Sequence, residues 1–226
     1  MDTQKTDLER WTAVDHYFSN LLVPSDLILE ATLQTNAAYG LPAMDVSPLQ
    51  GKMLMLLAQM QGARHILEIG TLGAYSTIWL ARALPAGGKL ITLEADPKHA
   101  AAARMNIACA GLSEVIDLRF GQALETLPQI AAEGHEPFDL IFIDADKQSN
   151  WEYFEWALKL SRPGSVIIVD NIARGGEVVN AESDDPRIHG VRRFSENLAA
   201  EPRVSATAIQ TVGSKGHDGF VLARVL

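Results

Sequence analysis

The stretch from Ile66 to Ser76, with the sequence ILEIGTLGAYS, constrains the fold more than any other part of the chain. Its first four residues are mostly apolar and too few for a helix, which favours a buried strand. A glycine-containing turn follows, and residues 76–84 have the pattern of an amphipathic helix. A strand, a glycine turn and a helix in this order are typical of an α/β domain that presents backbone N–H groups to a ligand.

The spacing within this turn indicates which ligand it suits. A dinucleotide site uses Gly-x-Gly-x-x-Gly, whereas this chain has Gly70-x-x-Gly73-x-x-Ser76. Glu68 comes two residues before the first glycine, and a carboxylate there would repel a pyrophosphate and attract a cation. S-adenosylmethionine, a nucleoside with an ammonium and a sulfonium group, matches that polarity. The alternative is that Glu68 is a solvated or arginine-paired strand end and that the glycines only form a turn.

Residues 1–60 precede the first strand, and their pattern predicts three helices. The first covers residues 7–23, the second begins after Ser25 or Asp26 and ends near Gly40, and the third covers 49–60 with Ser47 as its cap. No Gly/Ser-rich linker separates these helices from the rest of the chain. We therefore expect a single domain, 1–226, in which residues 1–60 form an N-terminal helical cover on an α/β core of residues 61–226.

Predicted strands and helices alternate from residue 64 onward. Strands are expected at 66–69, 89–94, 115–121, 138–144, 165–170, 204–212 and 219–226, with helices at 97–110, 123–132, 151–160 and 188–199. This alternation of helices with apolar strands predicts a mostly parallel sheet that has helices on both faces. The last two strands are joined by a short glycine-rich turn, which favours an antiparallel hairpin.

Charge and composition exclude several classes of protein. The net charge of −9 disfavours broad, nonspecific binding to nucleic acid. Cys109 is the only cysteine, so no intrachain disulfide is possible and a cytoplasmic location is expected. No apolar run approaches the roughly 18 residues of a membrane span, and we expect no membrane partner.

Acidic and amide side chains follow the predicted strands. Glu94 ends the second strand roughly 20 residues after the glycine turn, where an acidic residue can accept both hydroxyls of a ribose; alternatively, it caps the next helix. Asp144 ends the fourth strand, and Asp170 and Asn171 end the fifth. Adjacent parallel strands would bring these three oxygen ligands together, which suits Mg²⁺, Mn²⁺ or Ca²⁺. Lys147 could reach the same space.

Taken in order, these motifs resemble the cation-dependent class I O-methyltransferases, the group that contains the caffeoyl-CoA and catechol O-methyltransferases. The resemblance runs from about Val46 to the C-terminus and rests on Leu67-Glu68-Ile69-Gly70 with Tyr75-Ser76-Thr77, on Ile143-Asp144-x-x-Lys147, and on Val169-Asp170-Asn171. It implies a Rossmann-like methyltransferase sandwich with a mostly parallel seven-stranded sheet and an antiparallel C-terminal strand.

The resemblance also implies the ligands and their residues. S-adenosylmethionine would be held by Val46, Glu68, Gly70, Tyr75, Ser76, Glu94, Ala123 and Asp144. A divalent metal, Mg²⁺ or alternatively Mn²⁺ or Ca²⁺, would lie on Asp144, Asp170 and Asn171, and Asp144 and Lys147 would be catalytic, with Lys147 as the base. Members of this family are commonly homodimers, and their acceptor is usually a vicinal diphenol. The apolar side chains of the N-terminal helices, including Phe18 and Leu21, favour a dimer interface there.

We therefore expect methyl transfer from S-adenosylmethionine to a hydroxyl of a small catechol-like acceptor. The main alternative is methylation of a hydroxylated base in tRNA with the same cofactor and metal. That reaction would need Arg187, Arg192 and Arg193 as a basic patch, and the net charge argues against it. A nicotinamide oxidoreductase is disfavoured by the absent dinucleotide pattern. A noncatalytic S-adenosylmethionine-binding module is disfavoured because Lys147 and the three predicted metal ligands are all present.

Overall fold

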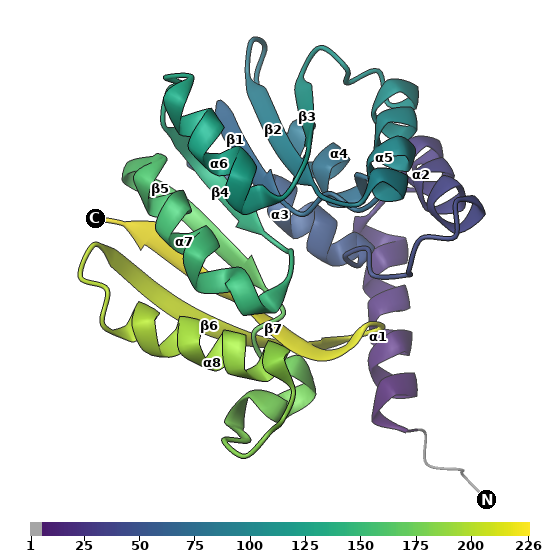
Figure 1. Ribbon diagram of the computed structural model, residues 1–226. Coiled ribbons are helices and arrows are strands. Elements are labelled where there is room, and N and C mark those ends of the chain that lie inside the picture. The colour runs from purple at the N-terminus through teal and green to yellow at the C-terminus, as the bar shows by residue number, and fades with distance from the viewer. Residues whose placement is uncertain (1–5) are drawn as a thin grey trace, which may run out of the picture.

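A computed structural model describes residues 6–226, so the first five residues of the predicted N-terminal cover lie outside the described residues. Figure 1 shows a twisted sheet flanked by helices, with α1 at the margin of the molecule. Along the chain the elements are α1 (Asp7–Leu22), α2 (Leu27–Ala38), α3 (Pro48–Gln61), β1 (His65–Ile69), α4 (Tyr75–Ala81), β2 (Lys89–Glu94), α5 (Pro97–Cys109), β3 (Ile116–Phe120), α6 (Ala123–Ala132), β4 (Phe138–Ile143), η1 (Lys147–Ser149), α7 (Asn150–Lys159), β5 (Ser161–Asp170), η2 (Arg174–Val179), α8 (Pro186–Ala199), β6 (Val204–Gly213) and β7 (Gly216–Val225).

The strands of residues 6–226 form one seven-stranded sheet in the order β3-β2-β1-β4-β5-β7-β6. Strands β1 to β5 pair in parallel, and β7 pairs antiparallel with both β5 and β6. This arrangement confirms the predicted fold class, including the antiparallel last strand. The strand order reverses between β1 and β4, and open parallel sheets bind their ligands at such a reversal, beyond the carboxyl ends of the strands.

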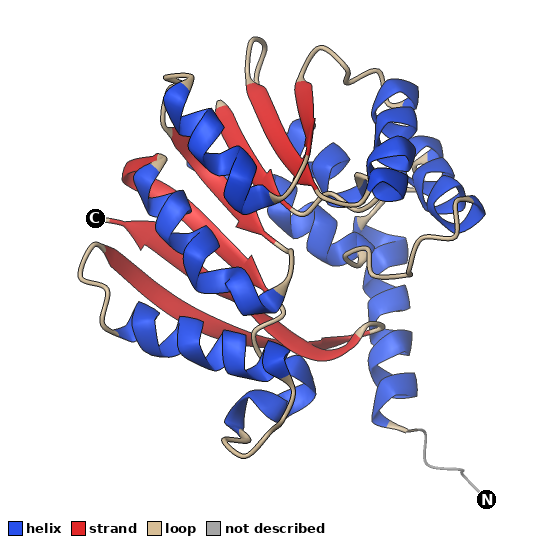
Figure 2. Ribbon diagram, viewed as in Figure 1, coloured by secondary structure: helices blue, strands red, loops and turns tan. Residues whose placement is uncertain are grey.

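Helices lie on both sides of the sheet (Figure 2). Because side chains alternate along the strands, the core consists of two layers, one on each face. Leu67 and Ile69 of β1 face one side of the sheet, where they pack in a cluster with residues of α6, α7 and α8. Ile66 belongs to the opposite cluster, together with residues of α3, α4 and α5. Because β1, β2 and β4 are buried on both faces, they read as nearly continuous apolar runs in the sequence.

The three N-terminal helices differ in how deeply they pack. Helix α3 lies closely against α4: a β-carbon added to Gly51 would come within 2.4 Å of the Trp79 ring, so only glycine permits this approach. Helix α2 contacts α4 and α5, whereas α1 contacts α3 and β6 and buries none of its residues. No helix within residues 6–226 is both long and apolar enough to cross a membrane.

Several boundaries differ from the sequence prediction. Strand β5 begins at Ser161 instead of residue 165, because Ser161 pairs with Phe138 of β4 and a register shift accommodates the residues around Pro163. Strand β7 begins at Gly216 instead of residue 219, which shortens the hairpin turn. The polar loop after β5 contains the short helix η2. Each difference lies where Gly or Pro made the sequence look like a loop.

Candidate active site

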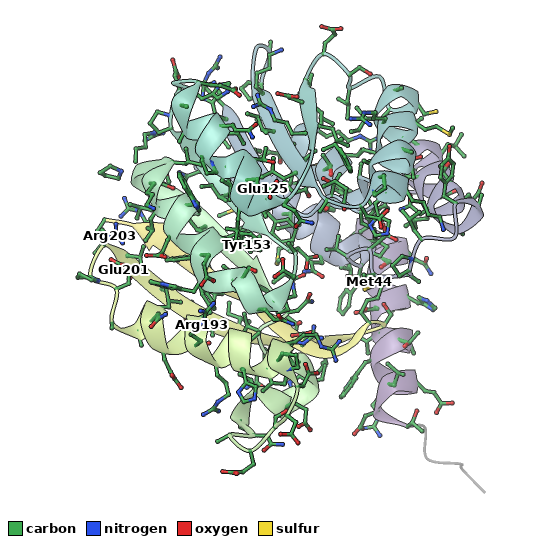
Figure 3. All side chains as sticks on the ribbon, viewed as in Figure 1. Met44, Glu125, Tyr153, Arg193, Glu201 and Arg203 are labelled. Atoms are coloured by element: carbon green, nitrogen blue, oxygen red, sulfur yellow. The ribbon has the colours of Figure 1, made fainter. Side chains whose placement is uncertain are left out.

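Three neighbouring cavities open at the carboxyl ends of the strands. The main cavity, of about 660 Å³, lies across the ends of β1, β2 and β4. The small cavity, of about 30 Å³, shares Gly70 and Asp144 with it. The side cavity, of about 300 Å³, shares Asn171 with the main cavity and is lined by α1, α3 and the β6–β7 hairpin. Figure 3 labels Met44 and Tyr153, two residues of the main cavity that come from the loop before α3 and from α7.

The glycine turn brings the ends of β1 and β4 into close contact. Gly70 has a φ of +96°, and a β-carbon on it would lie 2.2 Å from the backbone oxygen of Asp144. Leu72 and Ala74 also have positive φ values, of 49° and 69°, which are strained conformations for residues with a side chain. Such strain is concentrated at functional sites, which supports a ligand-binding role for the turn.

Glu68 differs from its predicted position at an open strand end. Its side chain is fully buried on the face toward α4, where its carboxylate accepts hydrogen bonds from Ser76, Thr77 and Thr92 at 2.5–2.7 Å. Burial raises the pKa of Glu68 to about 7, against the effect of these three donors. Glu68 does not line any of the three cavities. It therefore supports the turn and the start of α4 from below, and its contact with Ser76 joins it to the wall of the small cavity.

Glu94 connects the end of β2 to the glycine turn and still faces the main cavity. Its Oε2 accepts the backbone N–H groups of Thr71 at 3.2 Å and Leu72 at 2.8 Å, and its Oε1 accepts that of Asp96 at 2.8 Å. The His99 ring lies 3.6 Å from Oε1 and also lines the cavity. The backbone donors hold the carboxylate in one orientation, which pre-organises it for further donors such as ribose hydroxyls.

The other predicted cofactor residues reach the cavity walls from four segments. Val46, Tyr75 and Ser76 line the small cavity, Ala123 lines the main cavity, and Gly70 and Asp144 line both. The structure thus brings all the predicted cofactor residues except Glu68 to two adjoining cavities.

The predicted metal ligands meet at the neighbouring ends of β4 and β5. The register pairs Ile143 with Val169, so Asp144 and Asp170 follow at the same edge of the sheet. Burial and the nearby negative charge of Asp144 raise the pKa of the Asp170 carboxyl. Lys147 is buried, and its Nζ lies 2.8 Å from Oδ1 of Asp144.

This donor set fits a hard divalent cation. Two carboxylates and the Asn171 amide are oxygen ligands of the type that Mg²⁺ and Mn²⁺ prefer. Asn171 has a φ of +58°, in the left-handed region that asparagine adopts more readily than most residues, and it lines both the main and the side cavity. No group of three His, Cys, Asp or Glu residues that could hold a metal occurs in residues 6–226, so a cation at this position would need the Asn171 amide as its third oxygen from the protein.

Two structural partners of the site were not found by sequence reasoning. Gln50 of α3 donates from Nε2 to Oδ2 of Asp170 at 2.7 Å. Asn106 of α5 donates to the Gly73 carbonyl at 2.8 Å and to the Asn36 side chain at 2.9 Å, which secures the glycine turn from two helices. A single sequence carries no signal for these contacts, because each joins segments that only tertiary packing brings together.

The side cavity has a mixed lining, in which apolar side chains occur together with polar and charged ones such as Asp15 and Lys215. Leu49, Met53 and Phe220 form apolar walls, while Asp170 and Asn171 line its junction with the main cavity.

Comparison with known proteins identifies the family. The O-methyltransferase family model matches residues 22–226. A catechol O-methyltransferase of Niastella koreensis is 54% identical over 213 residues, which cover 94% of this chain and 96% of the relative. One of Mycobacterium tuberculosis is 50% identical over 212 residues, which cover 94% of each chain. A solved O-methyltransferase from Bacillus cereus in complex with SAH is 64% identical, with a TM-score of 0.96 over 97% of this chain and 100% of that one. The chain therefore belongs to the O-methyltransferase family and is an S-adenosylmethionine-dependent O-methyltransferase.

Proposed function

We propose that this enzyme methylates one hydroxyl of a small vicinal diphenol with the help of a divalent cation on Asp144, Asp170 and Asn171. The observation that carries the proposal is the junction of the two large cavities at Asn171, beside two carboxylates whose mutual repulsion a cation would relieve. Two relatives that are 54% and 50% identical to this chain are catechol O-methyltransferases, which supports the same acceptor class here.

The methyl donor is assigned to the main and small cavities. S-adenosylmethionine supplies the methyl group as part of a sulfonium, a good leaving group that needs no covalent enzyme intermediate. Glu94 would accept the ribose hydroxyls at the end of β2. Val46 and Ser76, in the small cavity, would surround the methionine end. The absence of a side chain at Gly70 would let the backbone approach the cofactor closely.

The acceptor is assigned to the side cavity, next to Asp170 and Asn171. A bound divalent cation would favour the ionised form of the phenol, whose pKa is near 10 in water. Leu49, Met53 and Phe220 would hold the aromatic ring, and thereby orient one oxygen toward the donor.

Lys147 is the proposed general base. It extends from the residues after β4 into the wall of the main cavity, and its contact with Asp144 holds the amine in place. As the neutral amine, it would take the proton from the hydroxyl that is methylated. Its burial limits competition from water for this proton.

We further propose that the enzyme is a homodimer built through α1 and β6. Helix α1 exposes Val14, Tyr17, Phe18, Leu21 and Leu22, each at 43–62% of its surface. It contacts β6, an edge strand whose residues 205–212 are exposed and carry no charge. Edge strands of monomers are usually protected by charges or proline, so an unprotected edge beside an apolar helix favours burial against a second copy.

Methylation of a tRNA base is not favoured. The arginines that it would need are already engaged: Arg187 pairs with Asp185 at 2.6 Å, and Arg193 pairs with Glu152 at 2.6 Å. Arg192 donates to a backbone carbonyl at 2.8 Å. These contacts leave little free positive charge on an acidic protein for a polyanion.

Methyl transfer to a series of phenols tests the proposal. Catechol and substituted vicinal diphenols should be methylated, whereas phenols with a single hydroxyl should react far more slowly because they cannot chelate a cation. EDTA should abolish the activity and added Mg²⁺ should restore it. Full activity after thorough dialysis against EDTA would rule out the metal while leaving the methyltransferase assignment intact.

A further inference from the structure

Gln50 is a polar residue of the N-terminal cover that contacts a predicted metal ligand directly. Its Nε2 donates to Oδ2 of Asp170 at 2.7 Å, across 120 residues of sequence. Asp170 is only 4% exposed, so this contact replaces water that the carboxylate would otherwise bind. Gln50 also lines the side cavity together with Asp170 and Asn171.

The position of Gln50 is fixed by local structure at the start of α3. Ser47 caps the helix, and its Oγ accepts the backbone N–H of Gln50 at 3.2 Å. Pro48 occupies the first helical position, where its fixed φ suits the helix. Gly51, the next residue, packs against the Trp79 ring and sets the distance between α3 and α4. The amide is therefore delivered to Asp170 by a rigid segment and not by a mobile loop.

We propose that Gln50 is a positioning residue that orients the Asp170 carboxylate as a ligand for the divalent cation and so sets the affinity for that cation. The inference rests on the proposed metal-assisted function. Carboxylates that bind metals are themselves usually hydrogen-bonded, and loss of such a partner typically costs about 10–100-fold in metal affinity or activity. Without the amide, the Asp170 side chain keeps its repulsion from Asp144 but loses the contact that fixes its orientation.

The hydrogen bond from the Gln50 amide also limits how Asp170 could bind a cation, because it occupies one of the two carboxylate oxygens. With Oδ2 engaged by Gln50, the carboxylate would have its other oxygen available for a cation. Asp144 is engaged in the same way, because Lys147 contacts its Oδ1. Each carboxylate of the site thus has one oxygen held by a nitrogen donor, from α3 for Asp170 and from the same loop for Asp144.

Binding of Mn²⁺ to the cofactor-free protein tests this role without relying on activity. Free Mn²⁺ is measured by electron paramagnetic resonance during titration of wild type and of Gln50→Leu, which keeps a similar volume but has no donor. We expect the Kd for Mn²⁺ to rise about 10–100-fold in Gln50→Leu. In steady-state assays the Mg²⁺ concentration for half-maximal rate should rise by a similar factor, while kcat at saturating Mg²⁺ stays within a few-fold of wild type.

Met53→Leu is the matched control. Met53 lies one turn further along α3 and lines the same cavity, but it has no polar contact with Asp170. This variant should change the KM for the acceptor and leave Mn²⁺ affinity unaltered. Gln50→Asn retains a donor on a side chain one methylene shorter, and it should weaken Mn²⁺ binding as well; it carries the test if Gln50→Leu does not fold.

The possible outcomes distinguish the metal-assisted function from the positioning role of Gln50. A wild-type protein that does not bind Mn²⁺ would overturn the metal-assisted function itself. Wild-type binding with equal or tighter binding by the Gln50 variants would overturn the positioning role alone. Weaker Mn²⁺ binding together with an equal loss of SAH affinity and a lower thermal unfolding midpoint would also overturn it, since that pattern indicates general disruption of the fold.

Discussion

Replacing Glu68 by glutamine should remove a pH dependence that burial builds into the stability of the protein. The glutamine side chain has the same shape, and its carbonyl and amide groups can still bond to the hydroxyls of Ser76, Thr77 and Thr92. It cannot ionise. Wild type and Glu68→Gln should therefore differ mainly in the free energy of ionising a buried carboxyl group.

The magnitude follows from the pKa of Glu68, which burial raises from 4.5 to about 7. Between these values the native state binds more protons than the unfolded state, so this contribution to stability falls as the pH rises. It is fully present below pH 4.5 and is lost once the pH has passed about 7. At about 1.4 kcal/mol per pH unit, the total loss is about 3 kcal/mol.

Urea unfolding, followed by tryptophan fluorescence in EDTA at several pH values from 5 to 8, measures this effect. Between pH 5 and pH 8, the free energy of unfolding of wild type should fall relative to that of Glu68→Gln by a large part of the expected 3 kcal/mol or so, that is, by about 2–3 kcal/mol. Subtracting the two curves removes contributions from the other titrating groups. A constant difference at every pH would refute the reasoning.

Three further predictions concern the cofactor, the base and the assembly. Glu94→Gln should weaken SAH binding by about 1.5 kcal/mol or more in calorimetry, since hydrogen bonds to a charged acceptor are lost, and unchanged affinity would count against a ribose contact. Lys147→Met should bind SAH normally but lose about 10²–10⁴ in turnover in single-turnover assays, and a smaller loss would exclude it as the base. Leu21→Glu, at a side chain that is 62% exposed in the single chain, should convert a dimer into a folded monomer in light scattering. A wild type that is already monomeric at micromolar concentration would contradict the proposed interface.

The glycine turn shows how far local sequence signals reach. The strand, turn and helix at residues 65–81 follow from apolar runs and glycine spacing, and the structure has them within a few residues of their predicted bounds. The N-terminal boundary of α3 was equally predictable, because a serine cap and a proline at the first position act through their own backbone neighbours. The start of β5 was not predictable, since Pro163 and Gly164 indicate a loop and only pairing with β4 draws that segment into the sheet.

Glu68 shows where the sequence was insufficient for the site. A carboxylate next to a glycine turn is compatible with an open strand end and with a buried one. The choice depends on whether donors from other segments reach it, and here Ser76, Thr77 and Thr92 do. Burial of an acidic side chain is tolerated only with such partners.

The sequence by itself determined the order of strands and helices, the parallel character of the sheet, and the placement of Asp144, Asp170 and Asn171 at strand ends. Hydrophobic periodicity and turn chemistry are local properties, and a parallel sheet then brings the carboxyl ends of its strands to one edge. Only the tertiary structure decided which face Glu68 occupies and that Gln50 meets Asp170. Those facts depend on how α3 and α4 pack over the sheet, and the packing of surfaces distant in sequence is not encoded in any single segment.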